Sequence, residues 1–469
     1  MENLNFEKLL GSHVYFIGIG GISMSGIAEI LLERGYIVSG SDMKNSDIIE
    51  RLIKKGADIH IGHDASNIDK VDLVVYTAAI SVDNPELVAA KKASIPCLDR
   101  AEFLGRLMKT YPFALGVSGT HGKTTTTSML SVIMKEGGLD PTVLVGGQVD
   151  GIGGNVRVGK SEYFLTEACE YVESFLKFSP RIAFILNIDE EHLDYFRDIE
   201  HIYSAFLKYA NLVPEGGFVI GSEDDPLVSR LMKEVDRAFI SFGIDKKADW
   251  MAKDISFDID GRATFTPSYR DKDFAPIKLR LPGRHNVYNA LAAMAGAYAL
   301  GVNMNIISKA LSMQNGAHRR FEIKKVIDNI TIIDDYAHHP NEIRATLETL
   351  KNIPHQRTFC VFQPHTYTRT KKLFPKFIDE LLDVDGVIIT DIYAAREKDP
   401  GDIHSRDLVR ALNQRGQKAK YISEFDNIVD YLLKKLSPGD VLITMGAGDV
   451  YKIGDKLIES LTKLTPKAL

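Results

Sequence analysis

Short β-branched runs alternate with helical patterns along almost the whole of this 469-residue chain. That order is typical of parallel sheets, because parallel neighbours need a crossover connection and a helix is the usual one. Three series of candidate strands follow one another. The first comprises HVYFIGIG (13–20), YIVSGSD (36–42) and VDLVVYT (71–77); the second FALGVSG (113–119), PTVLVGG (141–147), EYFLTEA (162–168) and RIAFILNID (181–189); the third ITIIDDYA (330–337), RTFCVFQP (357–364), DGVIITDIY (385–393) and DVLITMGAG (440–448).

These series predict an α/β protein of three domains, since an ordinary domain holds roughly 100–200 residues. We expect a Rossmann-like N-terminal domain at 1–108, a central P-loop domain at 109–316 and a Rossmann-like C-terminal domain at 317–469. Within the central domain, alternation over 240–280 favours antiparallel strands, and a long apolar helix is expected at 284–300.

The composition limits the kind of partner. A net charge of −6 offers no attraction to a polyanion, so we expect no nucleic-acid partner. No run approaches the roughly 18 apolar residues of a membrane span, and no signal-peptide pattern is found, so we expect a soluble, cytoplasmic protein without a membrane partner. The three cysteines lie far apart and form neither a disulfide framework nor a CxxC metal site.

The segment GVSGTHGKTTT (116–126) stands between a candidate strand and a candidate helix and is similar to a phosphate-binding P-loop, although its glycine spacing is not the common one. Glycines let backbone N–H groups turn toward phosphate oxygens, a lysine neutralises them, and a threonine hydroxyl suits Mg²⁺. The residues expected to contact ATP here are Gly119, Thr120, His121, Gly122, Lys123, Thr124 and Thr125.

Acidic groups follow the next two strands of this domain. Glu167 and Glu170 end one strand, and residues 189–192 (Asp-Glu-Glu-His) follow the other. Because the carboxyl ends of parallel strands meet at one edge, these groups should lie near the P-loop. We expect Thr124, Glu167 and His192 to hold a magnesium ion.

A glycine turn, GIGGISMSG (18–26), follows the first strand, and Asp42 ends the second. One interpretation is a tight strand–helix turn; the other is a diphosphate site, for either a dinucleotide or a nucleotide sugar. Strict G-x-G-x-x-G would need glycine where Ser23 stands, which counts against an NAD oxidoreductase. For a UDP-sugar the expected contacts are Gly18, Gly20, Gly21, Ser23, Asp42 and Thr77.

Larger blocks resemble one family. The segments GTHGKTTT, NIDEEHLDYF, PGRHNVYNALAA, HRRFE and DDYAHHP occur in the order and rough spacing of the Mur ligases, and the similarity runs from position 13 to about 455. Within that family the chain is most similar to the members that attach the first amino acid. The resemblance implies that domain 1–108 binds a UDP-sugar, 109–316 binds ATP and 317–469 binds an amino acid.

The resemblance also implies residue roles. Lys123, Glu167, His192 and His338 would be catalytic; His285, Asn286 and Asn289 would contact adenine and Asp335 the ribose; Tyr336, His338 and Arg369 would surround the amino acid. Arg319 and Arg320, in the stretch between two domains, either reach across to the ATP phosphates or are surface charges of a linker. Relatives often carry arginine where Thr366 stands, which would leave the amino-acid carboxylate to Arg369. The pair His338–His339 has no third ligand at a recognisable spacing, so a transition-metal site is not expected.

The implied activity is an ATP- and Mg²⁺-dependent amide ligation that joins L-alanine to the lactyl carboxylate of UDP-N-acetylmuramate through an acyl phosphate, in peptidoglycan precursor synthesis. Alternatives are a sister ligase, a folylpolyglutamate-type ligase, a nucleotide-regulated binding protein and an NAD oxidoreductase. Discrimination of alanine from glycine or serine, and the oligomeric state, stay open, because one methylene is worth only about 1–3 kcal/mol.

Overall fold

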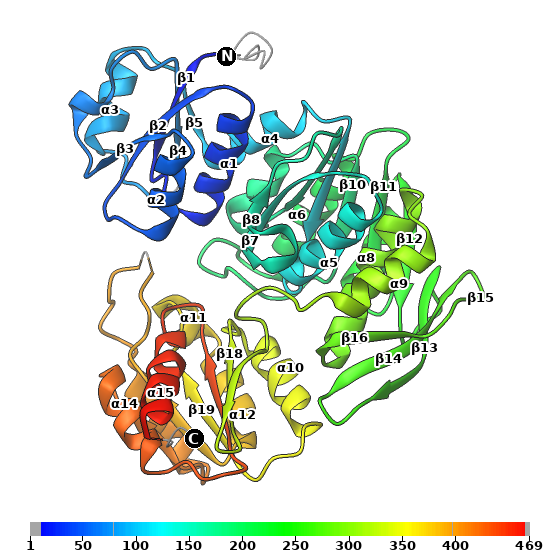
Figure 1. Ribbon diagram of the computed structural model, residues 1–469, viewed down its shortest axis with the longest axis vertical. Helices are drawn as coiled ribbons and strands as arrows, with labels where there is room; N and C mark the ends of the chain where they lie inside the picture. Colours follow the sequence, from blue (N-terminus) through cyan, green and yellow to red (C-terminus); the bar gives the residue numbers. More distant parts are fainter. Residues whose placement is uncertain (1–10, 78, 396, 465–469) are drawn as a thin grey trace, which may run out of the picture.

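The computed structural model describes residues 11–77, 79–395 and 397–464. Three sheets, each with its own helices, follow one another along the chain (Figure 1). The expected three-domain α/β fold is therefore confirmed. None of the helices in the described ranges is long and apolar enough to cross a membrane.

The first sheet has five parallel strands in the order β3-β2-β1-β4-β5. This order matches the first five strands of the Rossmann order 3-2-1-4-5-6. Side-chain caps fix where its helices begin: Asn84 accepts from the first turn of α3, and Asp99 does the same for α4. The elements are β1 (His13–Ile17), α1 (Ile22–Glu33), β2 (Ile37–Asp42), α2 (Asp47–Lys54), β3 (Asp58–Ile61), the 3₁₀ helix η2 (Ala65–Asn67), β4 (Leu73–Tyr76), α3 (Pro85–Lys92), β5 (Cys97–Asp99) and α4 (Arg100–Met108).

The central sheet has eleven strands, of which β12-β11-β10-β6-β9-β7 run parallel. Strand β13 continues the parallel run beside β12. Antiparallel pairs extend the sheet beyond it, β14 with β13, β15 and β16 at one end and β8 with β7 at the other. Its strands are β6 (Phe113–Ser118), β7 (Thr142–Val149), β8 (Gly154–Arg157), β9 (Tyr163–Glu167), β10 (Ile182–Ile185), β11 (Phe218–Ser222), β12 (Ala238–Gly243), β13 (Trp250–Phe257), β14 (Arg262–Tyr269), β15 (Lys272–Asp273) and β16 (Ile277–Pro282).

Helix α8 is almost entirely buried, because alanines and glycine let α5 and the sheet approach it closely. A Cβ on Gly296 would lie 2.4 Å from the Phe184 ring. The helices of this domain are α5 (Lys123–Glu136), η3 (Asp150–Ile152), η4 (Tyr171–Lys177), α6 (Ile199–Asn211), α7 (Pro226–Glu234), α8 (Arg284–Ala299) and α9 (Met304–Met313).

The third sheet has the order β17-β18-β22-β19-β20-β21, and only its edge strand β17 runs antiparallel to its neighbour. Its elements are β17 (Glu322–Ile327), β18 (Ile330–Asp335), α10 (Pro340–Lys351), β19 (Thr358–Phe362), α11 (Tyr367–Lys372), α12 (Phe374–Glu380), η5 (Leu381–Asp383), β20 (Gly386–Ile389), α13 (Ser405–Gln414), β21 (Ala419–Tyr421), α14 (Phe425–Leu433), β22 (Val441–Met445) and α15 (Tyr451–Leu464).

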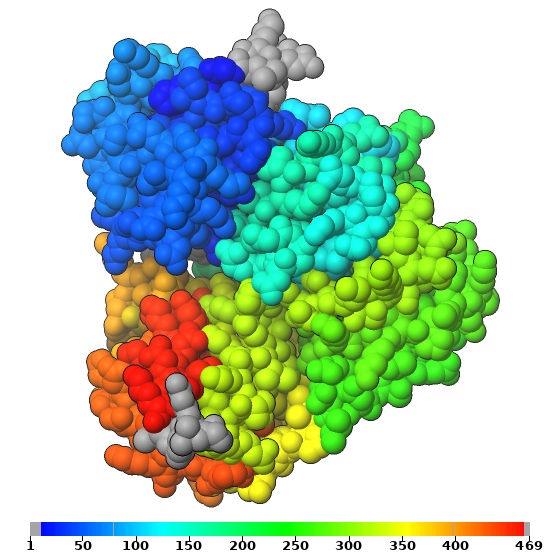
Figure 2. Space-filling view, viewed as in Figure 1, coloured from blue at the N-terminus to red at the C-terminus, as the bar shows by residue number. Residues whose placement is uncertain are grey.

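The outer domains both contact the central one (Figure 2). At the N-terminal contact, Asn155 of β8 donates to the Ile22 carbonyl at 2.7 Å and accepts from Arg51 at 3.0 Å. We keep 108 and 316 as proposed domain boundaries. The first coincides with the end of α4, and the second falls between α9 and β17.

Candidate functional site at the contact of the central and C-terminal domains

The loop 119–122 joins the carboxyl end of β6 to α5 in a backbone conformation that needs glycine. Gly119 and Gly122 have φ of +139° and +83°, and a Cβ on Gly122 would lie 2.5 Å from Asn289 Oδ1. Asn187 fixes the part of the loop between the two glycines. Its Oδ1 accepts from the His121 N–H at 2.8 Å, and its amide donates to the His121 carbonyl at 3.1 Å. The start of α5 therefore presents its N–H groups where an anion can bind.

Lys123, the first residue of α5, has its ammonium group beside the loop carbonyls and one carboxylate. Its Nζ donates to the Gly119 and Thr120 carbonyls at 2.5 and 3.0 Å, and lies 3.0 and 3.3 Å from the two oxygens of Glu170. Glu170 is almost completely buried, with 1% of its side chain exposed. Burial alone would lower the pKa of Lys123, but the Glu170 charge raises it above its usual value. The lysine is thus a fixed cation at the phosphate-binding loop.

A cavity of about 440 Å³ opens beside this loop, between the central and C-terminal domains. Its wall includes apolar side chains such as Leu186, Phe242 and Phe321, which suit the faces of a flat ring. Eight of the twelve residues expected to contact ATP line it: His121, Gly122, Thr125, His285, Asn286, Asn289, Arg320 and Asp335. The other four, Gly119, Thr120, Lys123 and Thr124, form the adjoining loop and helix start.

The polar residues at the start of α8 hold one another. Asn286 donates to the Pro282 carbonyl at 2.7 Å and accepts from Asn289 at 3.0 Å, and Asn289 accepts from Thr126 at 3.2 Å. Each amide nitrogen therefore retains one N–H for a ligand in the cavity. Burial lowers the pKa of His285 to about 4, so its ring is neutral and carries one acceptor nitrogen.

Two further expected residues reach the cavity from the C-terminal domain. Asp335, at the end of β18, accepts from the N–H groups of Phe321 and Ala337 at 3.0 and 2.7 Å. Burial raises its pKa to about 6. Arg320 lies over the Tyr336 ring, whereas Arg319 is bound to Asp334 and the carbonyls of 446 and 448. Of the two arginines, Arg320 is the one that lines the cavity.

The three residues expected to hold magnesium lie around the same loop. Thr124 and Glu167 approach one stretch of β7: Glu167 accepts from the Gly146 N–H at 2.6 Å, and a Cβ on Gly147 would meet the Thr124 methyl at 3.3 Å. His192 lies 3.9 Å from Glu170, and burial lowers its pKa, which keeps the ring neutral. The Thr124 hydroxyl and the Glu167 carboxylate supply oxygen ligands, which Mg²⁺ prefers, whereas a neutral imidazole such as that of His192 is more typical of transition metals. The two oxygen donors therefore fit Mg²⁺ beside phosphate oxygens, and the role of His192 stays a prediction.

A second, smaller cavity of about 140 Å³ lies at the same domain contact and includes Tyr336, His338, Thr366 and Arg369. Arg369 is already engaged: Nε and Nη2 donate to Glu191 at 2.9 and 2.5 Å, and Nη1 donates to His365 Nδ1 at 2.8 Å and to the His365 carbonyl at 3.1 Å. At most one of its five N–H donors, on Nη2, remains for another carboxylate. Thr366 caps α11, where its hydroxyl accepts from the Arg369 N–H at 3.4 Å.

His338 has a defined proton position. Its Nδ1 lies 3.0 Å from the Tyr336 carbonyl and 3.2 Å from the Glu342 carboxylate, both of which are acceptors. Nδ1 must therefore carry the proton, which leaves Nε2 with a lone pair. Burial lowers the pKa of His338 to about 4, so the ring is neutral near pH 7.

The six residues expected to bind a UDP-sugar gather at the carboxyl edge of the first sheet. The Gly20 N–H donates to Asp42 at 2.9 Å, and a Cβ on Gly18 would lie 2.7 Å from the Thr77 methyl. Gly21 is the N-cap of α1, and Ser23 in its first turn accepts from Arg100 at 3.1 Å. The turn leaves the start of α1 open to an anion, and Arg100 adds a cation that the motif did not indicate.

Sequence patterns indicated Glu191, within residues 189–192, but neither its partner nor a role for Glu342. Glu191 pairs with Arg369 across 178 positions, and Glu342 lies near His121 across 221 positions. These partners come from different domains, so no local spacing could reveal them. The strand ends did point to Glu170, but not to its contact with Lys123.

Family models match nearly the whole chain: "Mur ligase family, catalytic domain" over 13–112, "Mur ligase middle domain" over 117–297 and "Mur ligase, glutamate ligase domain" over 319–448. Among curated proteins, the UDP-N-acetylmuramate–L-alanine ligase of Acetivibrio thermocellus is 56% identical over 448 residues, covering 95% of this chain and 96% of its own. That of Caldanaerobacter subterraneus subsp. tengcongensis is 53% identical over 460 residues, covering 98% and 100%.

Solved structures agree with these matches. The UDP-N-acetylmuramate–alanine ligase of Thermotoga maritima superposes with a TM-score of 0.82 at 30% identity, covering 97% of this chain and 100% of its own. A murein peptide ligase from Psychrobacter arcticus, at 24% identity and a TM-score of 0.72, shares the fold. With identity above half over nearly the full length, the chain belongs to the Mur ligase family.

Proposed function

We propose that this protein joins L-alanine to the lactyl carboxylate of UDP-N-acetylmuramate while ATP is split to ADP and phosphate, in the cytoplasmic synthesis of peptidoglycan precursors. One observation carries the proposal: a cavity beside a P-loop and a much smaller cavity with an arginine and a neutral histidine lie at the same domain contact. The relatives described above, which carry this activity in their names, support the choice of substrates.

The reaction must activate a carboxylate, which is a poor electrophile near pH 7. In the proposed route its oxygen attacks the γ-phosphorus of ATP, the bond to the β-phosphate oxygen breaks, and an acyl phosphate and ADP result. Lys123 and the N–H groups at the start of α5 stabilise the charge on the transferring group. Mg²⁺, held by Thr124, Glu167 and His192, would supply further charge neutralisation at the phosphates.

The second step is attack by the alanine amine on the acyl carbon, after which the tetrahedral intermediate expels phosphate. The amine must lose a proton, and His338 Nε2 is an acceptor with a free lone pair in the small cavity. The remaining N–H of Arg369 would bind the alanine carboxylate. A volume of about 140 Å³ suits a single small amino acid better than a peptide.

The test is phosphate release from Mg-ATP with UDP-N-acetylmuramate and each of a panel of amino acids, together with the mass of the product. We expect release that requires both the sugar nucleotide and L-alanine, and a product heavier by one alanyl residue. Release with another amino acid would change the acceptor. ATP binding without any amino-acid-dependent release would refute the ligase and favour a nucleotide-regulated binding protein.

A further inference from the structure

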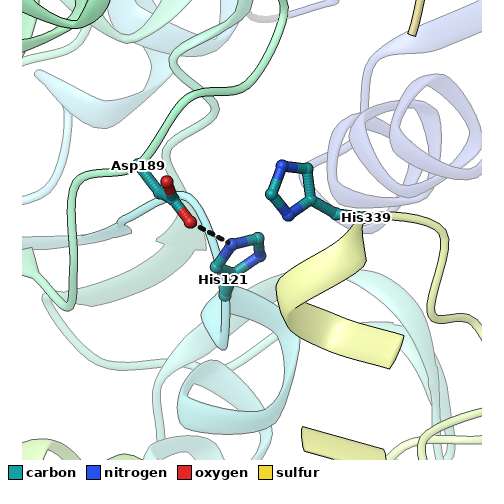
Figure 3. A group of neighbouring side chains, drawn as sticks. All are labelled: His121, Asp189 and His339. Carbon is teal, nitrogen blue, oxygen red and sulfur yellow. Dashed lines mark hydrogen bonds and ion pairs between the residues drawn. The ribbon is translucent and has the colours of Figure 1, made fainter. Parts of the chain in front are cut away.

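His121 lies in the middle of the P-loop, yet its ring bridges two domains (Figure 3). Its Nε2 lies 3.4 Å from Asp189 Oδ2, in the segment that follows β10 of the central domain. Its Nδ1 lies 3.3 Å from Glu342 Oε1, in the first turn of α10 of the C-terminal domain. The ring is also 5.0 Å from that of His339. A loop residue next to the phosphate site therefore contacts the domain that carries the small cavity.

The group formed by His121, Asp189 and His339 offers three possible metal-ligand atoms within 4.8 Å of one another. Hydrogen bonding argues against a metal there. His339 is the N-cap of α10, where its Nδ1 accepts from the Asn341 N–H at 3.3 Å, so Nε2 carries the proton and donates to the Glu190 carbonyl at 3.0 Å. Both nitrogens of His339 are thus in use within the protein.

The geometry instead indicates an ion pair. Each ring nitrogen of His121 faces a carboxylate, which can only accept, so both nitrogens carry protons and the ring is a cation. Burial alone would lower its pKa, but Asp189 and Glu342 raise it to about 9. The carboxylates respond in the opposite sense: the His121 contact helps to hold the pKa of Asp189 at about 2 and that of Glu342 well below its usual range.

Glu342 connects this cation to the expected amino-acid site. Its Oε2 accepts from the backbone N–H groups of His338 and His339 at 3.1 and 3.3 Å, which fixes the start of α10. On the other side, the backbone N–H of His121 is held by Asn187 within the P-loop. One continuous set of contacts therefore runs from the phosphate-binding loop through His121 and Glu342 to His338.

We propose that His121 is a positioning residue that couples occupation of the P-loop to closure of the C-terminal domain, by presenting a cation from the loop to Glu342. The kinetic test of this inference rests on the proposed ligase function, whereas the structural test, contraction of the protein on nucleotide binding, does not. A phosphate bound to the loop fixes the position of His121. The imidazolium then fixes Glu342 and the turn that carries His338, so the amino-acid site is completed after ATP has bound.

Two variants isolate the contact. His121→Gln removes the cation and keeps a polar side chain. Glu342→Gln removes the negative charge and retains an amide that still satisfies the capping box of α10. Glu348→Gln is the matched control, since Glu348 is an exposed carboxylate on the same helix. Three measurements should be made for each variant. They are the kinetics with L-alanine at saturating Mg-ATP, the binding of ATP without amino acid, and the radius of gyration with and without a non-hydrolysable ATP analogue.

We expect each of the two variants to lower kcat/KM for alanine by about tenfold, which is within the range of ordinary coupling between sites. The double variant should lower kcat/KM no further than the more impaired single variant does. The wild type should contract when the nucleotide analogue binds, and His121→Gln should contract less. The Glu348→Gln control should behave as the wild type.

Losses that add in the double variant would overturn the inference, because they would show that His121 and Glu342 act independently. So would a wild type that does not contract with nucleotide, or a His121→Gln variant that contracts normally. If the wild type contracts and His121→Gln does not, but no amino acid stimulates phosphate release, the coupling stands and the proposed ligase function fails.

Discussion

Replacing Glu170 by glutamine should tighten the binding of ATP in the absence of divalent metal. Both oxygens of Glu170 lie within 3.3 Å of Lys123 Nζ, and Glu170 is 1% exposed. Phosphate oxygens must compete with this carboxylate for the ammonium group, and they are repelled by its charge. A neutral amide of the same shape removes the repulsion and weakens the competitor.

The size of the effect follows from the kind of hydrogen bond that is exchanged. A hydrogen bond that involves a charged group contributes about 1.5–3 kcal/mol. We place the Lys123–Glu170 contact, in which both groups are charged, at the upper end of that range, and its counterpart in the Glu170→Gln variant, in which only the ammonium is charged, at the lower end. Exchanging the carboxylate for an amide therefore releases roughly 1–2 kcal/mol to nucleotide binding, which corresponds to an affinity about 5- to 30-fold higher. The Gly119 and Thr120 carbonyls still hold the ammonium, so the loop should keep its shape.

The assay is titration calorimetry of ATP in the presence of EDTA, which removes any contribution of Glu170 to a metal site. Glu173→Gln is the matched control, because Glu173 stands in the same segment but pairs with Lys208 at 3.3 Å. An unchanged or weaker affinity in a folded Glu170→Gln protein, shown by an unchanged melting temperature, would refute the idea that Glu170 competes with phosphate.

Three further outcomes follow from the site. Gly122→Ala should weaken ATP binding by about tenfold or more, measured by calorimetry, because the loop φ of +83° and the 2.5 Å approach to Asn289 Oδ1 both exclude a Cβ; unchanged affinity would show that the loop can shift. Arg369→Lys should raise KM for alanine by about tenfold in steady-state assays, because lysine cannot contact Glu191 and a carboxylate with a planar fork; an unchanged KM would remove it from the amino-acid site. Asp335 has a folded pKa of about 6, above its unfolded value, so its burial opposes folding more as pH rises from about 4 to 6 and by a constant amount above that. KM for ATP should rise as pH falls through about 6, and Asp335→Asn should abolish that dependence; a wild-type KM constant from pH 5 to 8 would contradict a role of the carboxylate in nucleotide binding.

The sequence predicted the buried strands best. The runs at 113–119 and 330–337 contain β6 and β18, and the apolar helix expected at 284–300 is α8. Such strands are easy to predict because both faces of the sheet are buried, so their apolar residues form a continuous run. The alternation over 240–280 correctly indicated antiparallel pairing, seen in β13 and β14.

Short edge elements escaped prediction. Strand β8 has four residues, β21 has three, and β17 pairs antiparallel at the edge of the third sheet. Strands β8 (GNVR) and β21 (AKY) hold one large apolar side chain each, and β17 (EIKKVI) has two lysines at its centre, so their apolar pattern is weak. Pairing with a neighbour already in place decides their conformation. The N-cap histidines of α10 and α13, both with capping boxes, are a second case, since Ser, Thr, Asp and Asn are the residues that ordinarily signal a helix start.

The sequence predicted the separate motifs of the site, but not the contacts between residues of different domains. A P-loop can be found from seven adjacent residues because its function depends on one continuous backbone. The pairs Glu191–Arg369 and His121–Glu342 each join two domains, so they exist only when the domains are together. Because an acyl phosphate is lost if water reaches it, a ligase gains from a site that forms only on closure. Dividing the charged groups between two domains suits such a site, since neither pair can form until the two domains meet. The part of the site least visible in the sequence is therefore the part that would let nucleotide binding control amide formation.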